Sequence, residues 1–342
     1  MKRYKNRKNH QLNKTKMAAL LLGAVIVLSG CGSDKQNPTP FSLEYEAGTL
    51  ILATGEENGT AQLAGSVVAS IINKRVPGIH VRQELSKGSM INARNVSKGT
   101  VNLALVAADV AFDAVNGLYS FEGDALEDLC VLGACYQEVS GWAALESSGL
   151  THVNQLKGKI LSTGSKASAT EMVSEEVFAV LGIDGTNSEL YSDSISASVK
   201  HVKRMTADAS HAFSTVPNGN HESIASEYGA AILSYTEEEV EAIVARNPRY
   251  FKTEIPAGTY TGQEEAASTF GIKVLLCASK EMDPDLAYEI ARALDLDGPL
   301  FAEEKPFMAA MLEETFLCNE LPIPLHEGAE IYYREMGFIK EN

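Results

Sequence analysis

Apolar residues follow two alternating patterns along most of this chain. From residue 47 onward, short continuous apolar runs, which are typical of buried strands, alternate with segments whose apolar positions recur every three or four residues, as on one face of a helix. Strands are predicted at residues 49–53, 79–85, 102–106, 130–134, 139–145, 159–163, 188–192, 210–214, 230–234 and 271–278, and helices at residues 60–74, 168–181, 195–205, 236–246 and 284–295. This alternation predicts an α/β fold with largely parallel sheets.

Polar residues mark where three of these helices begin. Thr60 is predicted to cap the first helix, and Ser168 with Glu171 forms the pattern of a capping box on the second. Asp283 is predicted to cap the last helix, where Pro284 occupies the first turn.

Two similar loops, about a hundred residues apart, each follow a predicted strand and open a predicted helix. The first is Thr54–Thr60 and the second is Thr163–Ser168. Ligands of open α/β sheets bind at the carboxyl ends of strands, and helix N-termini offer free N–H groups to anions. The repeat therefore predicts two lobes with an anion-binding cleft between them, although either loop is equally well an ordinary turn between a strand and a helix.

The first thirty residues differ in composition from the rest. Residues 1–16 hold seven Lys and Arg and no acid, and an apolar run over residues 17–28 is followed by Ser29, Gly30 and Cys31. This order is typical of an export signal, and the run is shorter than the roughly 20 apolar residues of a membrane-spanning helix. Residues 1–30 are therefore predicted to be a signal peptide and the polar residues 31–46 a flexible tether.

The charge of the chain limits its partners. The 342 residues include 29 Lys and Arg and 45 Asp and Glu, a formal net charge of −16. Removal of residues 1–30 takes away seven basic residues and leaves 22 against 45 acidic ones, a net charge of −23. A protein this acidic lacks the basic surface that nucleic acids or anionic lipid surfaces require, so neither is an expected partner.

The usual catalytic and metal-binding motifs are missing from the sequence. It has no phosphate-binding P-loop, no G-x-S-x-G nucleophile turn and no H-E-x-x-H zinc helix. No metal, no cofactor and no enzymatic activity are therefore expected. Apart from Cys31, the cysteines form no C-x-x-C pair and are expected to be buried thiols; they are Cys130, Cys135, Cys277 and Cys318.

Six segments in chain order carry a family resemblance. They are Thr54–Thr60, Lys87–Asn92, Ala108–Gly117, Leu156–Ser165, Ile255–Gln263 and Pro324–Gly337. The chain resembles the TAXI-type solute-binding proteins of TRAP transporters over most of residues 49–338, most closely in the I-P-A-G-x-Y-x-G-Q segment and the C-terminal P-x-H-x-G-A signature. Residues 28–31, Leu-Ser-Gly-Cys, resemble the lipobox of bacterial lipoproteins, in which the cysteine is lipidated; the alternative is an ordinary signal peptide with a chance cysteine.

The resemblance implies a type II periplasmic-binding-protein fold, in which two α/β lobes joined by crossover strands close on a ligand. Lobe 1 is expected at residues 47–140 and 272–342, and lobe 2 at residues 141–271. The implied ligand is a small carboxylate or amino acid, and the implied partners are the membrane subunits of a TRAP permease. The protein is expected to be a monomer outside the cytoplasm, anchored to the cell membrane by lipid on Cys31.

The resemblance also implies which residues bind the ligand, mainly through hydroxyl and main-chain N–H groups that hold a carboxylate. The candidate ligand-binding residues are Thr54, Gly55, Asn58, Thr60, Ser89, Asn92, Asp109, Thr163, Ser165, Ser168, Thr170 and Thr215. The two loops also carry Glu56, Glu57 and Lys166. Each acid is either a favourable charge at a helix N-terminus or a partner for an ammonium group of the ligand, and the lysine is a possible partner for an acidic one.

Two other functions fit the same sequence less directly. A ligand-sensing lipoprotein that presents its bound form to a receptor kinase would use the same fold. A hydrolase on an α/β scaffold would need an activated nucleophile beside a base, and no Ser or Cys stands in a recognisable motif of that kind.

Overall fold

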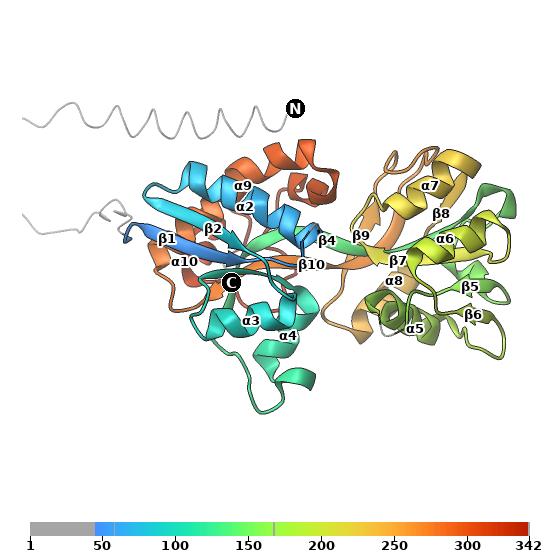
Figure 1. Ribbon diagram of the computed structural model, residues 1–342, viewed down its shortest axis with the longest axis horizontal. Helices are drawn as coiled ribbons and strands as arrows, with labels where there is room; N and C mark the ends of the chain where they lie inside the picture. The colour runs from blue at the N-terminus through green and yellow to red at the C-terminus, as the bar shows by residue number, and fades with distance from the viewer. Residues whose placement is uncertain (1–44, 58, 167, 341–342) are drawn as a thin grey trace, which may run out of the picture. The chain divides into compact units, whose positions relative to one another are not determined.

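The computed structural model describes residues 45–57, 59–166 and 168–340 (Figure 1). The predicted signal peptide, Cys31, most of the tether and Asn58 lie outside these residues. Helices of the described part are all too short or too polar to cross a membrane.

The ten strands of the described residues join in one sheet. Its order is β2-β1-β3-β10-β4-β7-β5-β6, with β8 paired to β4 and β9 paired to β10. The strands are β1 Gly48–Ala53, β2 Ile79–Glu84, β3 Leu103–Ala107, β4 Leu129–Leu145, β5 Ile160–Ser162, β6 Glu189–Tyr191, β7 Ala209–Ser214, β8 Ala230–Leu233, β9 Phe251–Ile255 and β10 Ala267–Ser279.

We use the term lobe 1 for the parallel strands β1, β2 and β3 with the helices that accompany them, and lobe 2 for β5 to β8 with theirs. The helices of lobe 1 are α2 Thr60–Arg75, α3 Ser89–Ser97, α4 Ala108–Asn116, α9 Pro284–Glu304 and α10 Glu327–Glu335. Those of lobe 2 are α5 Ala169–Leu181, α6 Ile195–Lys203, α7 Gly219–Tyr228 and α8 Glu237–Arg246.

Two long strands, β4 and β10, run antiparallel to each other and belong to both lobes (Figure 1). In lobe 1, β10 pairs with β3, and in lobe 2, β4 pairs with β7 and β8. These two strands are the crossover strands that the resemblance implies. The predicted lobe boundaries after residues 140 and 271 fall inside these two strands and remain a prediction, because the strands continue through them.

The sequence predicted two strands, at 130–134 and 139–145, where the structure has the single strand β4. Gln137 and Glu138 interrupt the apolar pattern at this point, and both are only half-buried. Each nevertheless pairs with β10, opposite Lys273 and Ile272. Polar side chains are tolerated here because the strand is passing between lobes rather than through the core of either one.

The last predicted helix, 284–295, continues as α9 to Glu304, through Pro299. The prediction followed apolar residues spaced by four, the last of which is Leu294, and so ended at Asp295, two residues before Asp297. Both are buried in the structure, where Asp295 accepts a hydrogen bond from the Tyr332 hydroxyl at 2.7 Å and Asp297 forms ion pairs with Lys74 and Arg75. Partnered acids of this kind remain inside a helix because their charges are compensated.

The expectation of buried thiols is confirmed for the four cysteines that the structure describes. Cys130, Cys135, Cys277 and Cys318 are all free and buried. Burial raises the pKa of Cys135 to about 12. A thiol in such surroundings is unreactive, because the thiolate is the reactive form.

Close packing of α10 on the start of α9 generates a stability prediction. A Cβ added at Gly328 would lie 1.9 Å from the carbonyl oxygen of Pro284, which is backbone and cannot move aside cheaply. Gly328→Ala is therefore expected to lower the free energy of unfolding by about 1–3 kcal/mol, measured by urea denaturation.

Gly185→Ala is the matched control for this variant. A Cβ at Gly185 would meet nothing within 4 Å, so its effect is expected to stay within about 0.5 kcal/mol. Equal effects of the two substitutions would show that α10 does not depend on this contact.

Candidate functional site

The carboxyl ends of the parallel strands of both lobes meet along a short stretch of β4 and β10. Ala107, at the end of β3, lies opposite Val274, which itself pairs with Tyr136. Ser214, at the end of β7, lies opposite Val139. Tyr136 and Val139 are three residues apart on one strand, which is about 10 Å. The loops that follow β1, β3, β5 and β7 therefore begin beside one another, and they define the candidate site.

On the lobe 1 side, the structure brings three of the predicted residues together. The Asn92 amide, fully buried, donates to the carbonyl oxygens of Thr54 at 2.7 Å and Leu105 at 2.8 Å, which ties the ends of β1 and β3 to α3. The Thr54 hydroxyl donates to Glu84 O, and the Ser89 hydroxyl accepts from Ala107 N at 3.0 Å. These side chains hold the loops in place. Because a hydroxyl that accepts one bond still has a proton to donate, Ser89 can also serve a ligand.

The helices that begin beside the candidate site differ between the lobes in how their N-termini are capped. In lobe 1, the residues that precede α2, α3 and α4 are Gly59, Gly88 and Ala107, and none makes a side-chain capping bond. In lobe 2, Ser168, Ser194 and Asn218 each accept backbone N–H groups at the start of α5, α6 and α7. The starts of α2 and α3 thus lack the capping side chains that α5, α6 and α7 have, whereas α9 and α10, further from the site, are capped by Asp283 and His326.

The predicted cap at Thr60 is wrong, because the helix begins one residue earlier in register than the sequence suggested. Thr60 is the first helical residue of α2, and Gly59 is the N-cap residue, with its own N–H donated to Glu56 O at 3.1 Å. This position of the N-cap matters for the site, because a glycine at residue 59 leaves the α2 N-terminus without a capping hydroxyl. Neither α2 nor α3 has an acidic residue in its first turn, whereas α4 has Asp109, whose carboxylate accepts from Val110 N.

On the lobe 2 side, the predicted hydroxyls are partly engaged in the protein. Thr163 donates to Tyr191 O at 3.1 Å, Thr170 accepts from Phe213 N at 3.1 Å, and Ser168 caps α5 by accepting from Glu171 N. Ser165 and Lys166 are exposed in the loop between them. Of the other predicted residues, Gly55 is buried and Thr215 is half-buried.

Sequence reasoning missed the one charged residue of β4. Glu138 lies between the lobes, and burial, followed by the nearby Asp109 carboxylate, raises its pKa to about 7. Burial also raises the pKa of Asp109, and Asp113 raises it further. The signal that could have found Glu138 is a lone acid in an otherwise apolar strand of seventeen residues.

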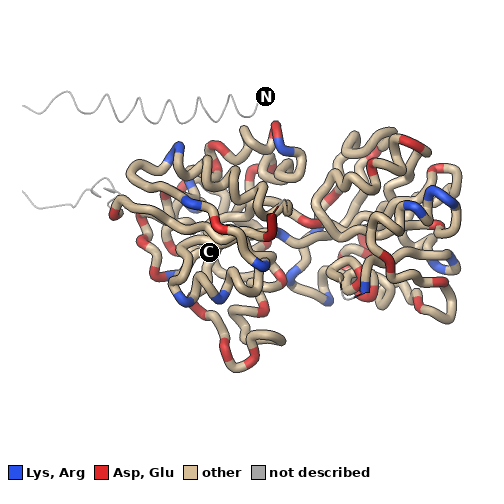
Figure 2. The backbone as a smooth tube through the Cα atoms, in the orientation of Figure 1, with Lys and Arg blue, Asp and Glu red and all other residues tan. Residues whose placement is uncertain are grey.

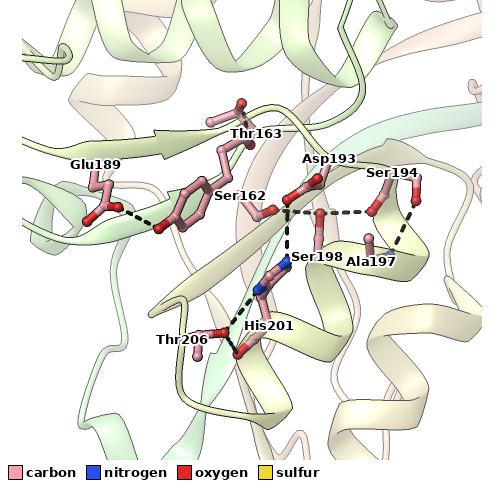
Figure 3. Close-up of polar contacts among 10 residues, drawn as sticks. Ser162, Thr163, Glu189, Asp193, Ser194, Ala197, Ser198, His201 and Thr206 are labelled. Carbon is pink, nitrogen blue, oxygen red and sulfur yellow. Dashed lines mark hydrogen bonds and ion pairs between the residues drawn. The ribbon is translucent and has the colours of Figure 1, made fainter.

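Polar contacts at the start of α6 adjoin the lobe 2 part of the site (Figure 3). The Ser162 hydroxyl donates to Ser198, which donates to Ser194 O, and His201 lies 3.5 Å from Asp193. The other ring nitrogen of His201 lies 2.9 Å from the Thr206 hydroxyl, which closes the end of the helix. The Ser162–Ser198 bond fastens α6 to β5.

A buried histidine between two serines gives no support to a hydrolase. His211 lies 2.7 Å from the Ser174 hydroxyl and 2.9 Å from the Ser140 hydroxyl, and all three side chains are inaccessible to solvent. Its ring stacks on Trp142 at 4.5 Å, and burial lowers the pKa of His211 to about 3. The low pKa keeps the ring neutral. Because the ring is fully buried, no substrate reaches it, and its role is structural. Groups of three or more His, Cys, Asp or Glu that could hold a metal are also absent from the described part of the chain.

Known structures identify the class of fold. A TctC solute-binding protein from Polaromonas superposes with a TM-score of 0.55 at 11% identity, covering 85% of this chain and 98% of that chain. The fold is thus that of type II periplasmic binding proteins, and the predicted fold class is confirmed. The chain itself belongs to the NMT1-like family, whose sequence pattern matches residues 52–337. The expectation that it is not an enzyme agrees with this family and fold.

Two further structures match at lower TM-scores. The periplasmic aliphatic sulphonate-binding protein SsuA from Escherichia coli matches with a TM-score of 0.47 at 12% identity, covering 85% of this chain and 84% of that chain. The L-cystine solute receptor of Neisseria gonorrhoeae, in its unliganded open conformation, matches with a TM-score of 0.46 at 13% identity, covering 77% and 93%.

The raised pKa of Glu138 predicts a pH-dependent stability. Below its ordinary pKa of 4.5 the carboxyl is protonated in the folded and the unfolded chain, whereas between 4.5 and about 7 only the folded chain keeps the proton. The folded state therefore loses stability as the pH rises through this window. Glu138→Gln, which cannot ionise, is expected to gain up to about 3 kcal/mol over the parent protein between pH 5 and pH 8, measured by thermal unfolding at both values.

Glu56→Gln is the control for this measurement, because Glu56 is exposed. It makes the same acid-to-amide change on the surface and is measured at the same two values of pH. A stability difference for Glu138→Gln that does not change with pH would contradict the proposed environment of the carboxyl.

Proposed function

We propose that this chain is an extracytoplasmic solute-binding protein whose ligand, a small organic acid or amino acid, binds between the two lobes. The observation that carries the proposal is the start of α2 and α3. Both helices begin at the carboxyl edge of the lobe 1 sheet without a capping side chain and without an acid in the first turn. The N–H groups at the start of a helix and the positive end of the helix dipole together favour a carboxylate there.

The side chains beside these helices suit the same group. Ser89, the first residue of α3, keeps a proton to donate, and Thr60 is the first residue of α2. A carboxylate that receives several N–H and O–H bonds leaves water without leaving its oxygens unpaired. Ser165 and Ser168 would add donors from lobe 2 when the lobes close, so that binding favours the closed form.

Two buried acids, Asp109 on α4 and Glu138 on β4, would distinguish a ligand that is an amino acid from one that is a simple organic acid. Asp109 and Glu138 are both held where burial disfavours their charge. An ammonium group between them would compensate both charges. Glu56 and Glu57 are exposed beside the α2 N-terminus. Water already solvates their charges, so an ammonium group would stabilise them less.

The net charge of the protein requires that the ligand be held by local donors. Asp and Glu are spread over both lobes rather than gathered in one place (Figure 2). An anionic ligand therefore approaches against the field of the whole molecule. The N–H groups of α2 and α3 act over a few ångström, where that field is outweighed by direct hydrogen bonds.

The resemblance to TAXI-type proteins supports a TRAP permease as the partner. Its segments coincide with elements of the site: Lys87–Asn92 opens α3, and Ala108–Gly117 forms α4 and its end. Ile255–Gln263 forms the connection from β9 toward β10. On this proposal, the protein delivers its ligand to membrane subunits driven by an ion gradient, and lipid on Cys31 keeps it at the membrane.

A thermal-shift screen of organic acids and amino acids tests the proposed function. A true ligand at 100 times its dissociation constant is expected to stabilise the protein by about 2.7 kcal/mol. No rise in melting temperature with any acid or amino acid would overturn the proposal.

Ser89→Ala and Ser165→Ala then test the placement of the site. Each removes one hydroxyl donor to a charged group, so the dissociation constant of a ligand found in the screen is expected to rise by about 10-fold or more, measured by calorimetry. Ser70→Ala is the control, because Ser70 is exposed on α2 and its hydroxyl bonds to Ser66 O on the same helix. Unchanged affinity in all three variants would mean that the ligand binds elsewhere.

The lipid anchor is testable in cells. Cys31→Ser is expected to move the protein from the membrane fraction to the soluble extracytoplasmic fraction and to abolish incorporation of labelled fatty acid. Ser33→Ala, which keeps the thiol, is expected to behave as the parent does. Retention of Cys31→Ser in the membrane fraction would exclude lipid on this residue as the anchor.

A further inference from the structure

Arg249 lies in the short segment that connects α8 to β9, and its neighbours fasten that segment to lobe 2. Asn247, which is buried, donates its amide to both carboxylate oxygens of Glu176 in α5, at 3.3 and 3.4 Å. The ring of Tyr250 lies 6.3 Å from that of Phe213 in β7. Because both flanking positions are held, the backbone at Arg249 moves with lobe 2.

The side chain of Arg249 reaches into lobe 1. Its guanidinium group forms an ion pair with Asp113 of α4. It also lies 5.5 Å from the ring centroids of both Phe112 and Tyr119, the first on α4 and the second just after it. Arg249 thus makes a charged contact and two cation–π contacts with the same part of lobe 1.

The ion pair between Arg249 and Asp113 connects the two lobes. Of the ion pairs among the residues that the structure describes, it alone joins lobe 2 to lobe 1, whereas the others connect residues of the same lobe. The contact therefore adds a second, lateral constraint beside the two crossover strands.

Burial makes this contact more than a surface ion pair. Only 17% of the Arg249 side chain and 19% of the Asp113 side chain are exposed. The Arg249 Nε atom is buried without a hydrogen-bond partner, so the terminal nitrogens carry the pairing with Asp113. Exposed ion pairs contribute little, but loss of one partner from a partly buried pair leaves the other charge uncompensated and is costly.

The partner helix also carries a candidate ligand residue. Asp113 stands four residues after Asp109 on α4, which is about one helical turn. A helix of nine residues held by its own hydrogen bonds moves as one piece. Whatever fixes Asp113 relative to lobe 2 therefore also fixes the first turn of α4, where Asp109 lies.

We propose that Arg249 is a positioning residue that latches lobe 2 to α4 and so sets the arrangement of the two lobes. The latch acts beside the crossover strands, and it determines how far the α4 N-terminus stands from the Thr163–Ser168 loop. This inference does not depend on which ligand the protein binds, since it rests on contacts between residues of the protein.

The test measures the distance between the lobes in the ligand-free protein by double electron–electron resonance. Spin labels are placed on Ser70→Cys in α2 and Ala179→Cys in α5, both exposed positions, in a Cys31→Ser background; the four other cysteines are buried. Arg249→Gln and Asp113→Asn are each expected to broaden the distance distribution and to shift its mean by more than the width of the parent distribution. Exchange of the charges, Asp113→Arg with Arg249→Asp, is expected to restore a narrow distribution.

Lys252→Gln is the matched control. It removes an exposed ion pair with Glu241 that lies within lobe 2, and it is expected to leave the distribution unchanged. A parent-like distribution in both Arg249→Gln and Asp113→Asn would overturn the latch, as would an equal broadening in Lys252→Gln. Because no ligand is added, this result is independent of the screen of acids: the latch can fail while an acid binds, and it can hold while none does.

Discussion

The antiparallel pairing of β4 with β10 is the contact on which the other features of this protein depend. It places the end of β3 and the end of β7 about three residues apart along one strand, so the loops that follow them share a site. The two strands approach so closely between the lobes that a Cβ at Gly271 would lie 2.3 Å from Glu138 O. The same stretch holds Glu138, whose pKa is raised by burial and then by the Asp109 carboxylate, while burial and Asp113 raise the pKa of Asp109.

The two lobes use similar polar residues in opposite ways. In lobe 2, Ser168, Ser194 and Asn218 complete the hydrogen bonds of the helices that follow them. In lobe 1, Asn92 joins the ends of two strands to a helix, and the N-termini of α2 and α3 have no side-chain cap. On the proposed function, lobe 1 holds the carboxylate of the ligand with main-chain groups, and lobe 2 supplies hydroxyls on closure. This division keeps most of the binding geometry in backbone atoms that a strand and a helix already fix.

The sequence predicted those elements whose burial is one-sided or complete. The strand at 49–53 and the helices at 60–74 and 168–181 agree with β1, α2 and α5 because their apolar residues face a single core. The helices α3 and α7 and the strand β9 produced no such pattern, since each buries only a few residues between polar neighbours. The prediction also missed Glu138, which stands out only as a lone acid in its strand, and Arg249, for which the sequence pattern holds no signal. Their importance comes from which residues the fold brings beside them, and Arg249 meets Asp113 across 136 residues of sequence.

The position of β10 in the sheet has a consequence for how the chain folds. It lies between β3 and β4, yet it follows them by more than a hundred residues, after all of lobe 2. The segments of lobe 1 that are synthesised first therefore have an unpaired strand edge until residues 267–279 arrive. Such long-range pairing slows folding and leaves apolar edges open to association, so lobe 2 is expected to be ordered while lobe 1 is still incomplete. On the proposed function the chain is exported, and a chain of this design then needs protection until β10 arrives. The strand β10 is also the one that later holds the two lobes together.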